Sequence, residues 1–318
     1  MTDQFDEVFG ATPQHGGMSP VARLSRDLRK AAETLSDHEA RFLVDAYYQM
    51  QEQRIRADGQ IRSIVKSNKQ QEKAEPHDVL TWLSDQSGAL EVQVRGALDR
   101  YVKTHMMGDW LYSVYGIGPV ISAGILAHID INKAPTAGHI MSYAGLVEGR
   151  TWEKGQKRPW NAGLKTLFYK VGESFVKFSN RPECKYGKLW RERKEHEIER
   201  NVSGELADQA TRALAAKNFG TATDARAWYG GCFTAEHGRE IFAADAATRL
   251  ELFAKHKGAP GSGLPMLPPA HIHARARRWA VKIFISNLHE VWFELATGRK
   301  APVPYAMAHL NHAHKIEP

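Results

Sequence analysis

Residues 111–126 read LYSVYGIGPVISAGIL and place a Gly-Xaa-Gly-Pro turn between two apolar runs. Gly116 can adopt the positive φ that reverses the chain, and Pro119 has the fixed φ suited to the first position of a helix. Gly118 has no side chain that would hold a phosphate away from the backbone. The stretch therefore predicts two helices joined by a tight turn. This is the pattern of a helix-hairpin-helix, a module that grips nucleic-acid backbone without reading bases.

The predicted turn offers backbone groups to a ligand. Amides at the start of its second helix would lack intrahelical acceptors, and a backbone phosphate is a natural partner there. The alternative is an ordinary tight turn whose glycines serve packing only. The turn carbonyls at 115–118 are also a candidate site for a monovalent cation. The candidate nucleic-acid contacts of the turn are Gly116, Ile117, Gly118, Val120 and Ile121.

Positive charge is concentrated just downstream of this turn. Residues 150–200 carry fourteen Lys or Arg and seven Asp or Glu, whereas residues 1–110 carry fourteen and seventeen. A localised basic block suits a polyanion. Its cations alternate with two tryptophans on a Gly-rich loop, which suits phosphate contact with stacking on a base or sugar. The alternative is a solvated loop whose tryptophans dock into the core. The candidate contacts are Arg150, Trp152, Lys154, Lys157, Arg158, Trp160 and Lys165.

The segment before the turn predicts two long helices. Residues 1–35 read as a flexible arm with a short helix at 21–34. Residues 36–68 hold apolar residues at helical spacing, with Ser36 and Glu39 arranged as a capping box. After a polar break, a second helical pattern runs over 79–114. We expect residues 36–110 to form an antiparallel hairpin or coiled coil that also mediates self-association, two packed helices of a bundle being the alternative.

The segment after the turn predicts more helices. A domain over 111–200 would contain the helix-hairpin-helix and the basic block, with at most a small β-hairpin around 146–160. Residues 201–318 would be a helical extension with a Gly/Pro linker at 258–270, an amphipathic helix at 271–296 and an extended tail. The start of that last helix carries cations that oppose the helix dipole, and an anionic partner would explain their placement. The alternative is a solvated face whose Arg stems cover apolar surface. These cations are Arg275, Arg277, Arg278 and Lys282. The expected fold class is mainly α.

Composition argues against several protein classes. The chain has 42% hydrophobic and 25% charged residues, and no apolar run approaches the roughly 18 residues that a bilayer requires. Its acidic N-terminus does not resemble a secretory signal. Two cysteines, Cys184 and Cys232, are too few for a disulfide framework or a four-cysteine metal site. We expect a cytoplasmic protein with no membrane partner, no resident metal among its fifteen histidines and no cofactor.

The order of these pieces resembles a known family. A long helical hairpin, the Gly116-Ile-Gly-Pro turn, the sequence YAGLV at 143–147 and a basic Gly-Xaa-Lys-Arg stretch are similar to the C-terminal half of DEDD-type, RuvC-like insertion-sequence transposases, the bridge-RNA-guided recombinases. The resemblance covers about residues 40–200 and, more loosely, the Arg-rich helix after residue 270. It implies a helical, DNA-binding domain that in the family follows a RuvC-like domain with four acidic Mg²⁺ ligands.

Two departures from the family limit what the resemblance implies about chemistry. The residues before Ser36 hold no RuvC-like sheet, so we expect no Mg²⁺ carboxylates unless catalysis is retained. The resemblance also implies a serine nucleophile before the glycine of the basic stretch, but residues 153–157 read EKGQK. The remaining hydroxyl candidates for a nucleophile are Ser142, Thr151 and Ser174.

Three functions remain open from the sequence. The leading hypothesis is a DNA-binding protein of the transposase type, gripping duplex or branched DNA without sequence preference; the same features would suit RNA. The second is an active recombinase that uses one of the three hydroxyls. The third is a helical protein-interaction module.

Overall fold

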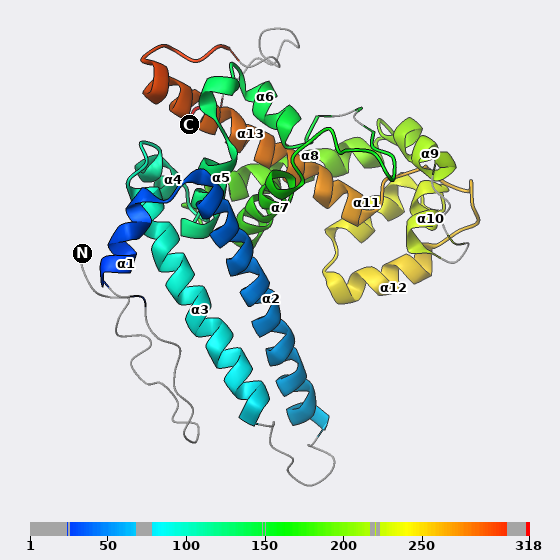
Figure 1. The fold of residues 1–318 in the computed structure, drawn as a ribbon. Helices are drawn as coiled ribbons and strands as arrows, with labels where there is room; N and C mark the ends of the chain where they lie inside the picture. Colours follow the sequence, from blue (N-terminus) through cyan, green and yellow to red (C-terminus); the bar gives the residue numbers. More distant parts are fainter. Residues whose placement is uncertain are drawn as a thin grey trace. The chain divides into compact units, whose positions relative to one another are not determined.

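The computed structural model describes Leu24 and residues 26–67, 78–147, 149, 151–216, 220, 223–303 and 316–318. Regular secondary structure in these residues is entirely helical (Figure 1). The prediction of a mainly α chain is therefore confirmed for the described residues. The described part of 146–160 forms turns and irregular structure rather than strands. Much of the tail and of the predicted arm lies outside the described residues.

The chain divides into two compact units. The first holds the residues up to Ser113 together with Ile117–Asp130, and the second holds Val114–Gly116 together with Ile131–Pro318. One boundary between the units therefore falls inside the Gly-Xaa-Gly-Pro turn, between Gly116 and Ile117, and another lies just before the turn, between Ser113 and Val114.

The first unit is built on two long helices. Ser36 and Glu39 form the expected capping box at the start of the first of them: the Ser36 amide donates to Glu39 Oε2 at 2.8 Å, and the Glu39 amide donates to Ser36 Oγ at 3.4 Å. The helices of this unit are α1 (Arg26–Ala31), the 3-10 turn η1 (Ala32–Thr34), α2 (Asp37–Ser67), α3 (Asp78–Lys103), α4 (Gly108–Ser113) and α5 (Pro119–His128).

Helices α2 and α3 lie side by side and run in opposite directions (Figure 1). At one end of this pair, α5 packs against both helices. Its residues from Ser122 to Ala127 are all buried, as expected for a short apolar helix that is covered on several sides. Val44, Leu98 and Val102 complete the core at this end.

The second unit is organised around its last helix, which contacts α6, α7 and α8. Aromatic rings of three elements meet there: Phe175 stacks on Tyr186 at 4.9 Å between centroids, and Phe284 lies edge-on to both. The elements of this unit are η2 (Ile131–Lys133), α6 (Ala137–Tyr143), α7 (Ala162–Lys177), α8 (Lys185–Val202), α9 (Ala207–Ala216), α10 (Asp224–Tyr229), α11 (Ala235–Ala243), α12 (Ala246–His256) and α13 (Pro269–Thr297).

A second aromatic core, centred on Trp228 and Phe233, joins α9–α12 to the segment before α13. The stretch that the sequence predicts as a Gly/Pro linker carries no helix before Pro269, but it is packed. Met266 and Leu267 are fully buried, and the side chain of the buried Asn201 both donates to the Leu267 carbonyl and accepts from the Leu267 amide, at 2.9 and 2.8 Å. This segment is therefore part of the unit's core.

Candidate nucleic-acid interface

The basic loop between α6 and α7 is closed at its base by one residue pair. The Asn161 amide donates to the Tyr143 carbonyl and Asn161 Nδ2 donates to Tyr143 Oη, both at 2.8 Å. Asn161 is also the N-cap of α7, since its Oδ1 accepts from the Leu164 amide at 2.9 Å. One side chain therefore starts the helix and fixes both ends of the loop.

Trp160 is held against the base of this loop. Gly145 has a φ of +65°, and a Cβ atom there would lie 2.7 Å from the Cγ of Trp160. Only glycine permits both the backbone conformation and this close approach. The indole is half-buried, and Lys165 Nζ lies 4.3 Å from the ring centroid. Trp160 thus anchors the loop and carries a cation over its face.

Residues 151–159 are all exposed. Arg158 Cζ lies 4.8 Å from the ring centroid of Trp152, and Trp152 Nε1 donates to the Gln156 carbonyl at 2.6 Å. Lys154, Lys157 and Arg158 form no ion pair with a carboxylate of the described chain. The loop therefore presents three cations whose charge is not neutralised by described residues, beside an indole that is 37% exposed. Arg150 lies outside the described residues.

Unlike the cations of the loop, two of the arginines at the start of α13 pair with carboxylates of the chain. Arg277 pairs with Glu173 of α7, and its Cζ lies 4.0 Å from the ring centroid of Tyr169. Arg275 Nε lies 2.7 Å from Glu197 Oε2, and Arg275 Nη1 donates to Gln209 at 2.9 Å. Both guanidinium groups therefore have anionic partners inside the second unit. Arg278 is exposed and Lys282 is half-buried.

Glu197 explains the position of Arg275. Its side chain is completely buried, and a buried carboxylate without counter-charge would be costly. Arg193 and Arg200 of the same helix also pair with it, Arg200 at 3.4 Å. Three guanidinium groups, each about a quarter exposed, thus surround one carboxylate. The sequence reasoning missed Glu197, although its spacing from Arg193 and Arg200 on one helix was a signal.

The part of the turn that belongs to the second unit is tied to α7 and α8. Gly116 has a φ of +95°, and its carbonyl accepts from Ser174 Oγ at 2.6 Å. The Tyr115 carbonyl accepts from Cys184 Sγ at 3.7 Å, and the Tyr115 ring lies edge-on to Phe178. Two of the carbonyls predicted to face a monovalent cation therefore already accept hydrogen bonds from the protein.

The part of the turn that belongs to the first unit leaves the start of α5 open. Gly118 is the N-cap, with extended backbone and no side-chain capping bond, and Pro119 is at the first helical position. The amides of Gly118, Val120 and Ile121 have no hydrogen-bond acceptor among the described residues, and a Cβ at Gly118 would meet nothing within 4 Å. Ile117 and Val120 are buried. Backbone donors at this helix N-terminus thus have no acceptor among the described residues, and the space beside Gly118 is open.

The three hydroxyl candidates have no catalytic partners in the described part of the chain. Ser174 donates to a backbone carbonyl, and neither Ser142 nor the exposed Thr151 bonds to a described histidine or carboxylate. An activated nucleophile needs such a base within hydrogen-bond reach. The described residues also contain no group of three or more His, Cys, Asp or Glu placed to hold a metal ion.

Comparisons with known proteins place no relative beside this site. No protein-family model matches the chain, and neither a curated protein nor a solved structure shows significant similarity to it. None of the described helices is both long and apolar enough to cross a bilayer.

Tyr143 and Asn161 hold the candidate site together, and the sequence reasoning missed both of them. Asn161 precedes a helical pattern that begins at Ala162, and an Asn in that position is a signal for an N-cap. The pairing of Asn161 with Tyr143, 18 residues earlier, leaves no mark in local sequence.

Proposed function

We propose that this chain is a nucleic-acid-binding protein of the transposase type that grips DNA backbone without sequence preference. The observation that carries the proposal is the exposed loop 151–159, with Lys154, Lys157 and Arg158 unpaired among the described residues and Trp152 beside them. Exposed cations that no described carboxylate neutralises are available to phosphates, and neutralising phosphates releases counterions.

Order in the loop supports this function. Trp160 and Asn161 fix its ends, and the indole hydrogen bond of Trp152 to Gln156 closes a turn within it. A loop that is already folded loses less conformational entropy when a ligand binds. The exposed face of Trp152 would suit stacking on a base or sugar once Arg158 turns to a phosphate.

The open start of α5 is the second proposed contact. Its free amides and the absence of a side chain at Gly118 suit a backbone phosphate, as expected for a helix-hairpin-helix formed by α4, the turn and α5. Amides and lysines at these positions do not read base edges, so the binding would be insensitive to sequence. Arg275 and Arg277 are left out of the proposed contacts because carboxylates of the chain already pair with them.

The test is the salt dependence of binding to a labelled 30-base-pair duplex, followed by fluorescence anisotropy between 50 and 300 mM KCl. If Lys154, Lys157, Arg158 and Lys165 each neutralise one phosphate, the slope of log K against log salt is about −3.6, which is a loss of about 600-fold over this range. The triple variant Lys154→Gln, Lys157→Gln, Arg158→Gln should reduce the slope to about −1.

Arg239→Gln is the matched control. Arg239 is 56% exposed, but it pairs with Glu199 at 3.1 Å, so its removal should leave the slope unchanged. Equal slopes for the triple variant and the wild type would remove the loop from the interface. A flat salt profile, or strong preference for one duplex sequence, would refute the function. If the chain bound single-stranded RNA more tightly than the DNA duplex, the proposed ligand would be RNA instead of DNA.

A further inference from the structure

The seam, by which we mean the contact surface between α2 and α3, is polar beyond the end of the helix pair that α5 covers. Arg54 of α2 binds Glu91 of α3 through two contacts, Nε–Oε1 at 2.7 Å and Nη2–Oε2 at 3.2 Å. Ser84 Oγ donates to Asp58 Oδ1 at 2.5 Å. Among the described residues between 51 and 95, Ala57 is the one hydrophobic residue that is buried. This part of the helix pair therefore gains little stability from burial within the described chain, although long helices depend on such packing.

The apolar residues of this region follow seven-residue repeats on one side of the pair. In α2 the repeat is Leu43, Met50, Ala57 and Ile64, and in α3 one repeat is Leu83, Leu90 and Ala97. A second repeat in α3 joins Leu80 to Val94 and is interrupted by the polar Ser87. Arg54 and Glu91 touch, so each marks the direction in which its helix faces the other. Successive residues of a helix are turned by about 100°, and counted from these two residues the repeats of α2 and α3 lie on the same side of the pair. Leu83 and Leu90 are 39% and 38% exposed.

Over residues 45–64 and 78–95, that side of the pair carries no charge. Ten charged residues lie between 45 and 64 and between 78 and 95, and by the same count all of them point into the seam or to the other faces. The positions between the apolar residues are glutamines. We call the side the neutral face; its outward members are Gln49, Met50, Gln53, Gln60, Ile64, Leu83, Leu90 and Val94.

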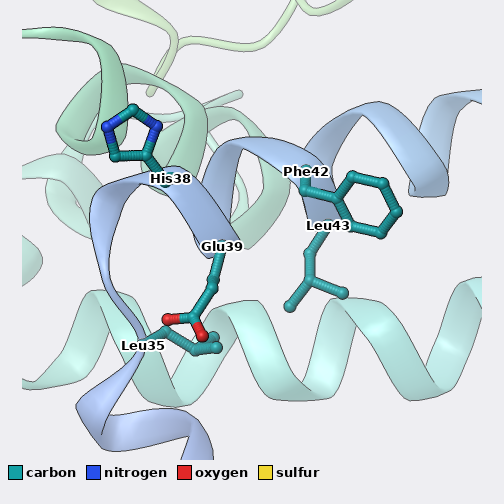
Figure 2. Close-up of a pocket in the computed structure, with 5 residues that line it drawn as sticks. All are labelled: Leu35, His38, Glu39, Phe42 and Leu43. Carbon is teal, nitrogen blue, oxygen red and sulfur yellow. The ribbon is translucent and has the colours of Figure 1, made fainter.

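A pocket lies at the end of the neutral face nearest the capping box. It has a volume of about 380 Å³ and is lined by Leu35, His38, Glu39, Phe42 and Leu43. Figure 2 shows Leu35, Glu39 and Leu43 on one side of the start of α2, with the Phe42 ring projecting beside them. Phe42 is 73% exposed. An exposed aromatic ring thus lies next to an apolar hollow large enough for a phenyl group.

We propose that the neutral face binds the same face of a second copy of this chain, with Phe42 of each copy entering the pocket of the other. A twofold contact places one surface against itself, so the surface must be complementary to itself. The neutral face meets this requirement: between Gln49 and Val94 it brings no like charges together, and its glutamine amides both donate and accept. At its end it carries a ring beside a hollow, where the carboxylate of Glu39 is already bound by Ser36.

Charge selects the second copy over a nucleic acid or a charged helix as the occupant. A phosphate backbone needs cations, and a helix with charges of one sign needs opposite charges, while this face offers neither. Pairing two neutral faces would bury the seven-residue repeats of four helices in one bundle and supply the packing that the polar seam lacks. This inference is independent of nucleic-acid binding.

The test is the mass of the full-length chain by sedimentation equilibrium between 1 and 100 µM, without nucleic acid. The wild type should sediment at twice the chain mass of 35.7 kDa. Leu90→Glu should raise the dissociation constant of the dimer at least about 100-fold, because two carboxylates would be buried without partners. The matched control is Ile55→Glu: Ile55 is 52% exposed on another face of α2, and its replacement should leave the dimer intact.

A cross-linking measurement covers the case in which Leu90→Glu fails to fold. Cys184 and Cys232 are buried, so an introduced surface cysteine can be cross-linked without interference from the native thiols. Gln53→Cys, on the neutral face, should form an interchain disulfide under mild oxidation, whereas Arg62→Cys, on another face, should not.

Three outcomes would overturn the proposal. The first is a monomer at 100 µM whose Gln53→Cys thiol is protected from alkylation, which would point to a segment of the same chain as the occupant. The second is a monomer with an accessible thiol, which would point to a different protein. The third is a dimer lost equally in Leu90→Glu and Ile55→Glu.

Discussion

Asn161→Ala should weaken the fold and the basic loop together, because one side chain serves both. In the wild type, Asn161 Oδ1 caps α7 through the Leu164 amide, and Nδ2 binds Tyr143 Oη across the base of the loop. Alanine keeps the backbone hydrogen bond to the Tyr143 carbonyl but removes both side-chain bonds. The variant therefore isolates the contribution of the side chain.

The magnitude follows from the two lost bonds. Loss of an N-cap costs about 1 kcal/mol. The bond to Tyr143 joins groups that water can still reach, since Tyr143 is 45% exposed, so it adds about 0.5 kcal/mol. The free energy of unfolding should fall by about 1.5 kcal/mol, measured by urea denaturation followed by circular dichroism. Asp245→Ala is the control: it removes the N-cap of α12 and should destabilise the chain by about 1 kcal/mol without changing duplex affinity.

Asn161→Asp separates stability from binding. The carboxylate can still cap α7 and interacts favourably with the helix dipole, so the free energy of unfolding should hold or rise. The added negative charge at the base of the loop should lower duplex affinity about fivefold, from roughly 1 kcal/mol between unit charges 4 Å apart in water. A change in unfolding free energy below about 0.5 kcal/mol for Asn161→Ala, the spread of ordinary surface substitutions, would refute the capping argument. Unchanged affinity for Asn161→Asp would refute the electrostatic one.

The other predictions concern the second unit. Gly187→Ala should lower the free energy of unfolding in urea by about 1–3 kcal/mol, because its Cβ would lie 2.7 Å from a backbone oxygen of α7. The control is Gly238→Ala, whose Cβ meets the flexible end of a methionine. It should change the free energy of unfolding by less than about 1 kcal/mol. Glu197→Gln should cost about 3 kcal/mol in the same assay, since three guanidinium groups lose their shared charge; a change no larger than that of a surface variant would contradict the pairing. Burial lowers the pKa of His289 from 6.5, so the unfolded chain binds more protons as pH falls below 6.5 and acid destabilises the fold. His289→Gln should flatten that slope between pH 7.5 and 5, and an unchanged slope would exclude His289 as its source.

Local sequence predicted the features that depend on near neighbours. The helical spacing of apolar residues, the capping box of Ser36 and Glu39, and the start of α5 at its proline all arise within a few residues. The exposure of Lys154 and Lys157 could also be anticipated, because the residues from Glu153 to Pro159 include no large apolar side chain and lysines are mostly exposed in proteins.

Local sequence did not predict which cations are already paired. Arg275 and Arg277 look as available as Lys154 in the sequence, but their carboxylate partners lie 78 and 104 residues away on other helices. Burial of Glu197 between helices made counter-charges necessary there, and nothing near Arg275 in the chain records that burial.

The sequence by itself determined that this chain is mainly helical, where its helices turn, and where its positive charge lies, because helix periodicity, caps and composition act over one or two turns. Tertiary structure decided which of those charges remain open to a ligand and which face of α2 and α3 is left neutral. Both depend on contacts between residues far apart in the chain: Arg54 pairs with Glu91 across the contact of the two helices, while Leu83 and Leu90 remain partly exposed. The spacing of apolar residues predicts which side of a helix is apolar, but only the packed structure shows whether another part of the chain covers that side.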